Sequence, residues 1–380
     1  MEHNTIYTGD ATETLQELPP ESVNMVMTSP PYWNLRDYGV DGQLGREETT
    51  GAFVQNLADV FDEVKRVLRP DGSLWLNLGD TYENKDLQQI PARVALELQQ
   101  RGWILRNRVT WAKPNPMPQS VKDRLNDTTE AVFHFVKDHD YWYDLDAIRE
   151  PYSESMERRK DCQSKHGGHE KDGWGGGDHH EGGGLLDNSQ TYADTMHPAG
   201  KNPGDVFEVT TKPFPEAHFA VYPPELCEKP IKATCPPTVC AKCGSPYERE
   251  TRDESGFTDG VCNACGASKS KHRQGAKNTD DNLSRNDTDR EIRNCSNNIT
   301  IGWTPTCDCD TDTTEAGIAL DPFAGAGTTL LKAKELGRQF VGVELNTKYA
   351  DMARARVGID VDDPSTVRDD ADQSGLEAYE

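Results

Sequence analysis

The sequence predicts an α/β fold in which a mostly parallel sheet is covered by helices on both faces. Short apolar runs, suited to buried strands, alternate along the chain with amphipathic stretches of helical period. Polar or acidic residues follow directly after several of these runs, and a glycine-rich turn joins one run to the next helix. Both features are typical of the ligand-binding edge of an open parallel sheet.

The amino-terminal half supplies three strands and two helices. Residues 23–28 form a mostly apolar run, which is expected to be a buried strand that ends at Ser29. A helix is expected next, because apolar residues recur on one helical face until the sequence Arg69-Pro-Asp-Gly72 stops the pattern. That face consists of Phe53, Leu57, Val60, Phe61, Val64 and Leu68. The elements that follow are a strand at 74–78, a helix at about 91–100 and a strand at 104–111.

The carboxyl-terminal half contains the glycine-rich turn. A strand at 317–321 ends in Asp321, and the turn that contains Gly325 and Gly327 opens a helix expected from about Thr328 to Leu336. The next strand, at 339–345, carries Glu344, and an acidic side chain there suits the hydroxyls of a ribose. The turn lacks the Gly-Lys-Ser/Thr of a triphosphate-binding loop. S-adenosylmethionine fits this turn because it has a ribose and an amino acid end but no phosphate.

The tetrapeptide Ser29-Pro30-Pro31-Tyr32 carries the predicted chemistry. Ser29 offers a hydroxyl, the Pro30 carbonyl is an acceptor with no competing N–H, and Tyr32 offers a ring on which a base can stack. Such a set can hold the exocyclic amine of a nucleic acid base, whose nitrogen is a poor nucleophile. Direct methyl transfer to that amine needs placement and acceptors, but no metal and no covalent intermediate.

Taken in this order, the tetrapeptide and the glycine-rich turn resemble the permuted, beta group of S-adenosylmethionine-dependent DNA amino-methyltransferases. Residues 7–10, 111–124, 130–137 and 218–226 are similar to further segments of that family. The resemblance implies a Rossmann-like methyltransferase fold and a catalytic role for the tetrapeptide. It also implies a cofactor-binding set, namely Asp10, His218, Phe219, Asp321, Phe323, Gly325, Gly327, Thr328 and Glu344.

The activity that the resemblance implies is methylation of a flipped base at a specific site in duplex DNA. The enzyme would act in a restriction–modification system with a cognate nuclease, or as a solitary methylase. Serine at position 29, where relatives also carry aspartate, favours the N4 amine of cytosine, and the N6 amine of adenine is the alternative. The chain has no Pro-Cys dipeptide, which argues against methylation at carbon 5 of cytosine. A non-enzymatic, zinc-containing DNA-binding protein is the alternative of another class, but it would not need both motifs.

Most of the cysteines gather between residues 227 and 309, and six of them form three closely spaced pairs. In a cytoplasmic protein, such pairs favour a structural zinc over disulfides. The family resemblance favours Cys240, Cys243, Cys307 and Cys309 as the four ligands. Simple ribbon spacing favours Cys240, Cys243, Cys262 and Cys265. Residues 232–314 are therefore expected to be a cysteine-rich insertion.

The rest of the chain is expected to divide by function. Residues 1–150 form the catalytic half of the methyltransferase domain, and residues 216–231 with 315–358 form the cofactor half. Residues 151–215 include a Gly- and His-rich stretch and are expected to be a mobile target-recognition region. Residues 359–380 are rich in acid and are expected to be a disordered tail.

The net charge of −24 opposes a DNA-binding role, because phosphate neutralisation demands an excess of Lys and Arg. The conflict weakens if the host cytoplasm is very salty, since the screening length falls to ~3 Å at about 1 M salt. The sequence therefore predicts a halophile, and it also resembles solitary CTAG methylases of halophiles. A cytoplasmic enzyme with no membrane partner is expected, because no apolar run approaches the ~20 residues of a membrane span and no signal peptide is recognisable.

Overall fold

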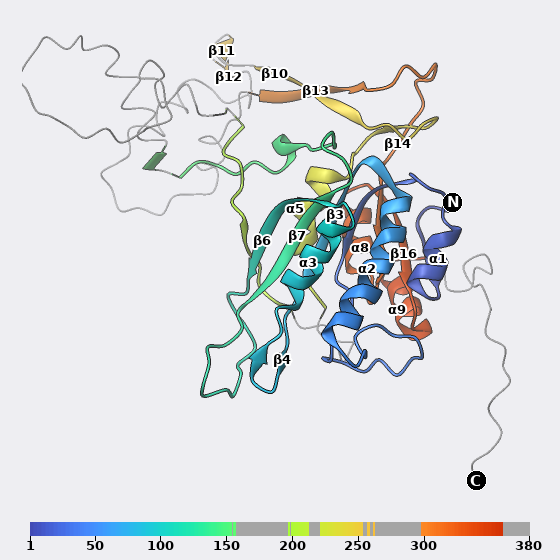
Figure 1. Cartoon of the computed structure of the whole chain (residues 1–380). Helices are drawn as coiled ribbons and strands as arrows, with labels where there is room; N and C mark the ends of the chain where they lie inside the picture. Colours follow the sequence, from blue (N-terminus) through green and yellow to red (C-terminus); the bar gives the residue numbers. More distant parts are fainter. Residues whose placement is uncertain are drawn as a thin grey trace, which may run out of the picture. The chain divides into compact units, whose positions relative to one another are not determined.

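The computed structural model describes residues 1–153, 155–156, 197, 199–212, 221–253, 257–258, 261–262 and 298–359. The chain divides into two compact units. One comprises Met1–Asp144, Gly204–Glu248 and Pro305–Glu380, and the other comprises Leu145–Pro203 and Arg249–Thr304. The first unit contains an eight-stranded sheet. Figure 1 shows helices packed against this sheet.

The order of the strands across this sheet is β1-β16-β15-β2-β3-β7-β6-β8. Five of the seven neighbouring pairs are parallel, and β7 alone runs against the other strands. The predicted mostly parallel sheet is therefore confirmed. The bounds of the strands are β1 Thr5–Thr8, β2 Val23–Thr28, β3 Leu68–Leu78, β6 Ile104–Ala112, β7 Thr129–Val136, β8 Val206–Glu208, β15 Ile318–Asp321 and β16 Gln339–Glu344.

Helices cover both faces, as predicted (Figure 1). One face packs against α1 (Ala11–Glu17), α2 (Thr50–Val67) and α3 (Ile90–Gln100). The other packs against α5 (Pro224–Thr234), α8 (Thr328–Glu335) and α9 (Thr347–Val357). In β2, Val26 belongs to the first apolar cluster and Met25 and Met27 to the second, because successive side chains of a strand point to opposite faces. Burial on both faces explains the nearly continuous apolar run.

The expected bounds of β2, α3, β6, β15, α8 and β16 differ from the observed ones at most at an end residue. The start of β3 was predicted wrongly. The sequence Arg69-Pro-Asp-Gly72 was expected to be a turn before the strand, but β3 already begins at the fully buried Leu68. Leu68 pairs with Val23, and the register then shifts between Val23 and Met25, so this sequence forms an irregularity within β3. A Cβ at Gly72 would lie 2.6 Å from the Leu68 side chain, so only glycine fits there.

Shorter elements complete the described chain. Four two-stranded sheets pair β4 with β5, β9 with β14, β10 with β13 and β11 with β12. Their bounds are β4 Tyr82–Glu83, β5 Asp86–Leu87, β9 Val239–Cys240, β10 Tyr247–Asp253, β11 Phe257–Thr258, β12 Val261–Cys262, β13 Asn298–Pro305 and β14 Thr314–Glu315, with a 3₁₀ turn at Leu145–Ala147. Among the described helices, none is long and apolar enough to cross a membrane.

Several predictions fall outside the described residues. These are the Gly- and His-rich stretch of the recognition region, the cofactor ligands His218 and Phe219, the thiol pair Cys262 and Cys265 as far as side chains are concerned, and the tail beyond residue 359. The predicted boundaries of the functional regions stay predictions.

Candidate active site

The tetrapeptide lies at the edge of the sheet where the parallel strands end. Ser29 follows the last residue of β2, which lies between β15 and β3. One neighbour of β2 is β3, which follows it in the chain, and the other is β15, which comes near the carboxyl terminus. The order of the strands across the sheet therefore changes direction at β2. Ligands of open α/β sheets bind in the crevice that such a reversal leaves. Since β7 runs the other way, its first residues, including Glu130, reach this same edge.

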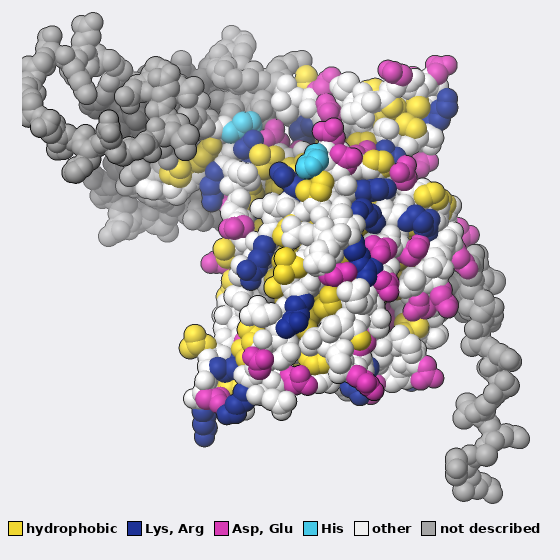
Figure 2. All heavy atoms as spheres, viewed as in Figure 1, with side chains coloured by type: hydrophobic (Ala, Val, Ile, Leu, Met, Phe, Trp, Pro, Cys, Tyr) yellow, Lys and Arg dark blue, Asp and Glu magenta, His cyan; other side chains and the backbone are white. Residues whose placement is uncertain are grey.

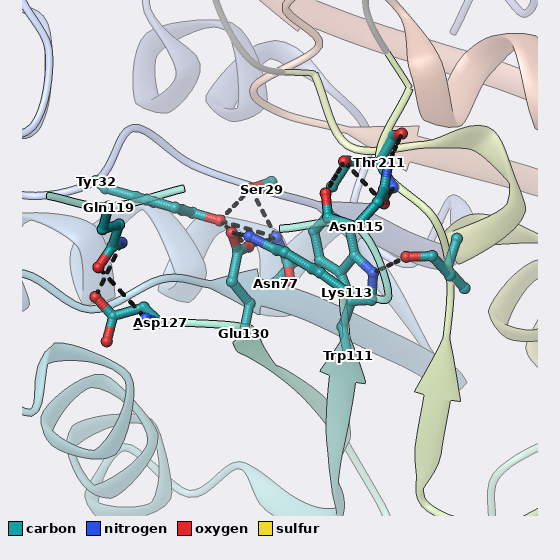
Figure 3. Close-up of polar contacts among 11 residues, drawn as sticks. Ser29, Tyr32, Asn77, Trp111, Lys113, Asn115, Gln119, Asp127, Glu130 and Thr211 are labelled. Atoms are coloured by element: carbon teal, nitrogen blue, oxygen red, sulfur yellow. Dashed lines mark hydrogen bonds and ion pairs between the residues drawn. The ribbon is translucent and has the colours of Figure 1, made fainter. Parts of the chain in front are cut away.

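Four polar side chains from three segments of the chain meet there (Figure 3). The Oγ of Ser29 lies 3.3 Å from the Tyr32 hydroxyl and 3.2 Å from the Nδ2 of Asn77 in β3. The Tyr32 hydroxyl donates to Glu130 at 2.6 Å, and Asn77 donates to the same Glu130 oxygen at 2.8 Å. The other oxygen of Glu130 is paired with Lys113, which follows β6.

Tyr32 holds its proton firmly. Burial raises the pKa of its phenol well above 10, and the negative charge of Glu130 raises it further. The Tyr32 ring is packed closely, since a Cβ at Gly79 would lie 2.5 Å from the ring. Glycine at the end of β3 therefore makes room for this ring. Tyr32 is placed as a neutral hydrogen-bond donor.

A second group of contacts lies beneath the glycine-rich turn. The side chain of Asp321 is fully buried, and it accepts hydrogen bonds from Thr28 at 2.6 Å and from the Phe323 N–H at 3.1 Å. Its other oxygen accepts from the Tyr222 hydroxyl at 3.1 Å. Burial raises the pKa of Asp321 to about 6, although these three hydrogen bonds oppose the shift. Asp321 thus joins β15 to β2 from inside the fold.

The turn itself is shaped by Gly325 and Gly327, which have φ values of +51° and +72°. The Gly325 N–H donates to Glu344 at 2.7 Å, and the other Glu344 oxygen accepts from the Asn346 N–H at 2.9 Å. Burial raises the pKa of Glu344. A Cβ at Gly325 would have only the Phe323 carbonyl oxygen near it, at 4.0 Å, whereas one at Gly327 would lie 3.0 Å from the Cβ of Ala353. Gly325 therefore faces a cradle, and Gly327 permits α8 and α9 to approach.

The remaining predicted cofactor residues have definite places. Asp10 caps α1 by accepting from the N–H groups of Thr12 and Glu13 at 2.8 and 3.0 Å. It follows Gly9, whose N–H donates to the Glu344 carbonyl at 3.0 Å, so Asp10 and Glu344 share one edge. Thr328 is buried at the start of α8 and accepts from Arg356. Phe323 is partly buried against the first apolar cluster.

The predicted catalytic and cofactor residues that lie within the described chain therefore gather at one edge of the sheet. Sequence reasoning missed Asn77, Lys113 and Glu130 as partners of the tetrapeptide, and Thr28 and Tyr222 as partners of Asp321. One local signal was available, because Asn77 is the polar residue of the otherwise apolar run at 74–78. Glu130 lay in a segment already similar to the family.

Four of the paired cysteines lie close together. The sulfur atoms of Cys240, Cys243, Cys307 and Cys309 all lie within 4.8 Å of one another. Cys240 ends β9 and Cys243 follows it, whereas Cys307 and Cys309 precede β14. The short pairing of β9 with β14 brings these two segments together. This is the set that the resemblance favoured.

Comparison with known proteins agrees with this arrangement. A family model described as DNA methylase matches residues 23–240 and 310–355. The type II methyltransferase M.XycI of Xanthomonas campestris pv. cyanopsidis is 30% identical over 93% of this chain and 87% of its own length. M.SmaI of Serratia marcescens is 28% identical over 93% and 90%, and M.SfiI of Streptomyces fimbriatus is 47% identical over 41% of each chain.

A solved structure titled PvuII DNA methyltransferase (cytosine-N4-specific) has the same fold. It covers 95% of this chain and 88% of its own, with a TM-score of 0.51 and 17% sequence identity.

Replacing Asp321 by Asn should remove a pH dependence of stability. Because the pKa of Asp321 rises from 3.8 to about 6 on folding, the folded protein holds this proton more tightly than the unfolded chain between those values. The Asp321 contribution therefore lowers the free energy of unfolding as the pH rises from about 4 to about 6, by ~3 kcal/mol in all. Urea unfolding of both proteins should show that, as the pH rises across this window, the free energy of unfolding of the variant increases by ~3 kcal/mol relative to that of the unaltered protein. A pH-independent difference would contradict the prediction.

Proposed function

This chain belongs to the N6/N4 family of DNA methylases, and we propose that it transfers a methyl group from S-adenosylmethionine to the N4 amine of a flipped cytosine at a specific site in duplex DNA. One observation carries the proposal. The hydrogen bond from Thr28 to Asp321 fixes the residue before Ser29 against the residue that opens the glycine-rich turn. An amine-binding turn and a cofactor cradle are thereby held side by side.

The tetrapeptide would bind the amine. The Ser29 hydroxyl and the Pro30 carbonyl accept its N–H groups, which keeps the nitrogen lone pair directed at the methyl group. Pro31 fixes the backbone of the turn, and the ring of Tyr32 contacts the face of the flipped base. The hydroxyl of Tyr32 is engaged by Glu130, so this ring is held in place before a base arrives.

The cradle suits S-adenosylmethionine, which when bound supplies an electrophilic methyl group on a sulfonium. Gly325 leaves open space where a side chain would otherwise stand, and Asp10 and Glu344 bring carboxylates to the same edge. The set proposed to hold the cofactor is Asp10, His218, Phe219, Phe323, Gly325, Gly327, Thr328 and Glu344. The fully buried Asp321 would support this set from beneath by holding β15 to β2.

Cytosine N4 is preferred over adenine N6 because position 29 is serine. The solved protein with the same fold is described by its title as cytosine-N4-specific. Membership of a methylase family disfavours a non-enzymatic DNA-binding protein. Because M.XycI and M.SmaI are named type II methyltransferases, a restriction–modification role with a cognate nuclease is supported, and a solitary CTAG methylase is the alternative. A DNA methylase must share a compartment with its DNA, so a cytoplasmic location is part of the proposal.

A structural zinc is proposed for the four clustered thiols. A tetrahedral ion with bonds of about 2.3 Å to sulfur needs thiolates about 4 Å apart, and the four sulfurs lie within 4.8 Å of one another. Such a closed site leaves no position for water, so the metal would stabilise the segments around β9 and β14 and take no part in methyl transfer.

The excess of acidic residues is proposed to be an adaptation to high salt. Figure 2 shows acidic and basic side chains interspersed on the face in view. At molar salt such a surface stays hydrated, while its repulsion of DNA is screened.

Ser29→Ala should abolish most methyl transfer without affecting cofactor binding. Loss of the hydroxyl acceptor should lower the single-turnover rate by about 100-fold or more. Ser22→Ala, which alters an exposed serine just before β2, is the matched control and should keep the full rate. Mass analysis of digested DNA should find N4-methylcytosine with the unaltered enzyme. N6-methyladenine in its place would refute the choice of base and leave the enzyme class standing.

Gly325→Val should abolish S-adenosylmethionine binding, as measured by calorimetry. The new side chain would fill the cradle and would also strain a left-handed backbone by ~1–3 kcal/mol. Gly337→Val controls for the strain, because Gly337 has φ +69° and open space but lies at the end of α8. Equal affinities in all three proteins would contradict the cofactor site.

Metal analysis should find about one zinc per chain in protein purified without a histidine tag. Replacing Cys240 and Cys243 by serine should release the metal and lower the thermal midpoint. Replacing Cys262 and Cys265 serves as the matched control, because retention of zinc supports the cluster with Cys307 and Cys309. Loss of zinc from the second variant would support the ribbon spacing instead, and metal-free folded protein would exclude both.

Folding and methyl transfer should persist or improve at about 1 M salt, where ordinary DNA-binding proteins lose affinity by several orders of magnitude. Circular dichroism and methyl transfer to genomic DNA across a salt series test this. An optimum at low salt, with steady loss above it, would defeat the halophilic proposal.

A further inference from the structure

A row of hydrogen-bonded oxygens leads from Ser29 away from the position proposed for the amine. The Ser29 Oγ lies 3.3 Å from the Tyr32 hydroxyl, which donates to the Oε2 of Glu130 at 2.6 Å. Resting on the proposed amine methylation, we propose that Glu130 takes up, through Tyr32 and Ser29, the proton that the methylated amine must lose.

Asn77 gives this row its direction. Its Nδ2 lies 3.2 Å from Ser29 Oγ, 2.9 Å from the Tyr32 hydroxyl and 2.8 Å from Glu130 Oε2. An amide nitrogen donates only, so the hydroxyl hydrogens of Ser29 and Tyr32 must point elsewhere. Each can then donate to the next oxygen, Ser29 to Tyr32 and Tyr32 to Glu130. Rotating the amide by half a turn would set its oxygen against the carboxylate, which fixes the orientation observed.

Lys113 fixes the carboxylate at the end of the row. Its ammonium pairs with one oxygen of Glu130, which leaves the other oxygen to Tyr32 and Asn77. The ammonium also lies 4.6 Å from the centre of the Trp111 ring, which holds it in place. Lys113 and Glu130 are mostly buried, with side chains 19% and 15% exposed, so water competes little for the carboxylate.

Tyr32 conducts a proton and is not itself the base. Its phenol stays neutral because burial and the Glu130 charge raise its pKa. A proton can pass through a neutral hydroxyl only if the hydroxyl gives up its own proton as it receives another. The short hydrogen bond to Glu130 provides that outlet.

The step is balanced. The amine nitrogen forms a bond to the methyl carbon while the carbon–sulfur bond breaks and its electron pair stays on sulfur. The nitrogen now carries a positive charge and one hydrogen too many. That proton goes to Ser29 Oγ, the Ser29 proton goes to Tyr32, and the Tyr32 proton goes to Glu130. Glu130 becomes a neutral acid and later releases the proton to solvent. The positively charged methylated amine is a strong acid, so it can give up its proton to a carboxylate.

Single-turnover methylation of heterologous genomic DNA tests the relay. Glu130→Gln keeps the size and an acceptor for Tyr32 but cannot bind the proton, so the rate should fall by about 100-fold with unchanged cofactor affinity. Asp127→Asn is the matched control, because it neutralises an acid in the β6–β7 connection, three residues before Glu130 and outside this row (Figure 3). The control should keep the full rate.

Two measurements distinguish proton transfer to Glu130 from a role in which Glu130 only holds Tyr32 in position. Tyr32→Phe combined with Glu130→Gln should lose no more than the worse single variant, since both interrupt one path. Formate should partly restore the rate of Glu130→Ala and leave Ser29→Ala unchanged. A Glu130→Gln enzyme as fast as the Asp127→Asn control would overturn the relay. So would additive losses combined with no rescue by formate.

Measurements on the unaltered enzyme test the proposed function separately from the relay. If the unaltered enzyme transfers no methyl group to any DNA, that function falls and the relay falls with it. If the product is N6-methyladenine, the choice of cytosine is wrong but the relay stands, because the adenine amine must lose the same proton.

Discussion

The buried hydrogen bond between Thr28 and Asp321 is the constraint on which the candidate site depends. It joins residues 293 positions apart in the sequence, and it does so at the adjacent ends of β2 and β15. The chain leaves β2 into the tetrapeptide and leaves β15 into the glycine-rich turn. Methyl transfer demands reacting atoms about 3–3.5 Å apart and in line. A fixed register between these two strand ends is what permits such placement.

Three of the carboxylates at this edge are each accommodated in a different way. Asp321 is buried under three hydrogen bonds and has a pKa raised to about 6. Glu344 accepts two backbone N–H groups and thereby shapes the turn. Glu130 is paired with Lys113. Because a buried carboxylate is costly unless it is hydrogen-bonded or paired, the differences assign different tasks to the same chemical group. Asp321 aligns strands, Glu344 holds a loop and Glu130 accepts hydrogen bonds from Tyr32 and Asn77.

Local patterns in the sequence predicted most of the sheet and the position of both turns, because strand and helix periods and glycine positions are local properties. The start of β3 escaped prediction, since a Pro-Asp-Gly sequence reads as a turn unless its pairing with β2 is known. Asn77 and Glu130 also escaped as partners of Ser29. Their meeting depends on β7 running against its neighbours, which no local pattern records. For the same reason the sequence could suggest Asp321 as a ligand, but not its complete burial.

The strand order has a further consequence for how such a protein can diversify. Because β2 and β15 are held together by the sheet, the stretch of chain between β7 and β8, which contains most of the predicted recognition region, need not keep a fixed length to align the two turns. The entropic cost of closing a flexible loop grows only with the logarithm of its length, about 0.6 kcal/mol for each doubling. Segments inserted there can be exchanged, lengthened or lost while the reacting edge stays unchanged. Evolution could thus alter which DNA sequence is chosen without rebuilding the machinery that modifies it.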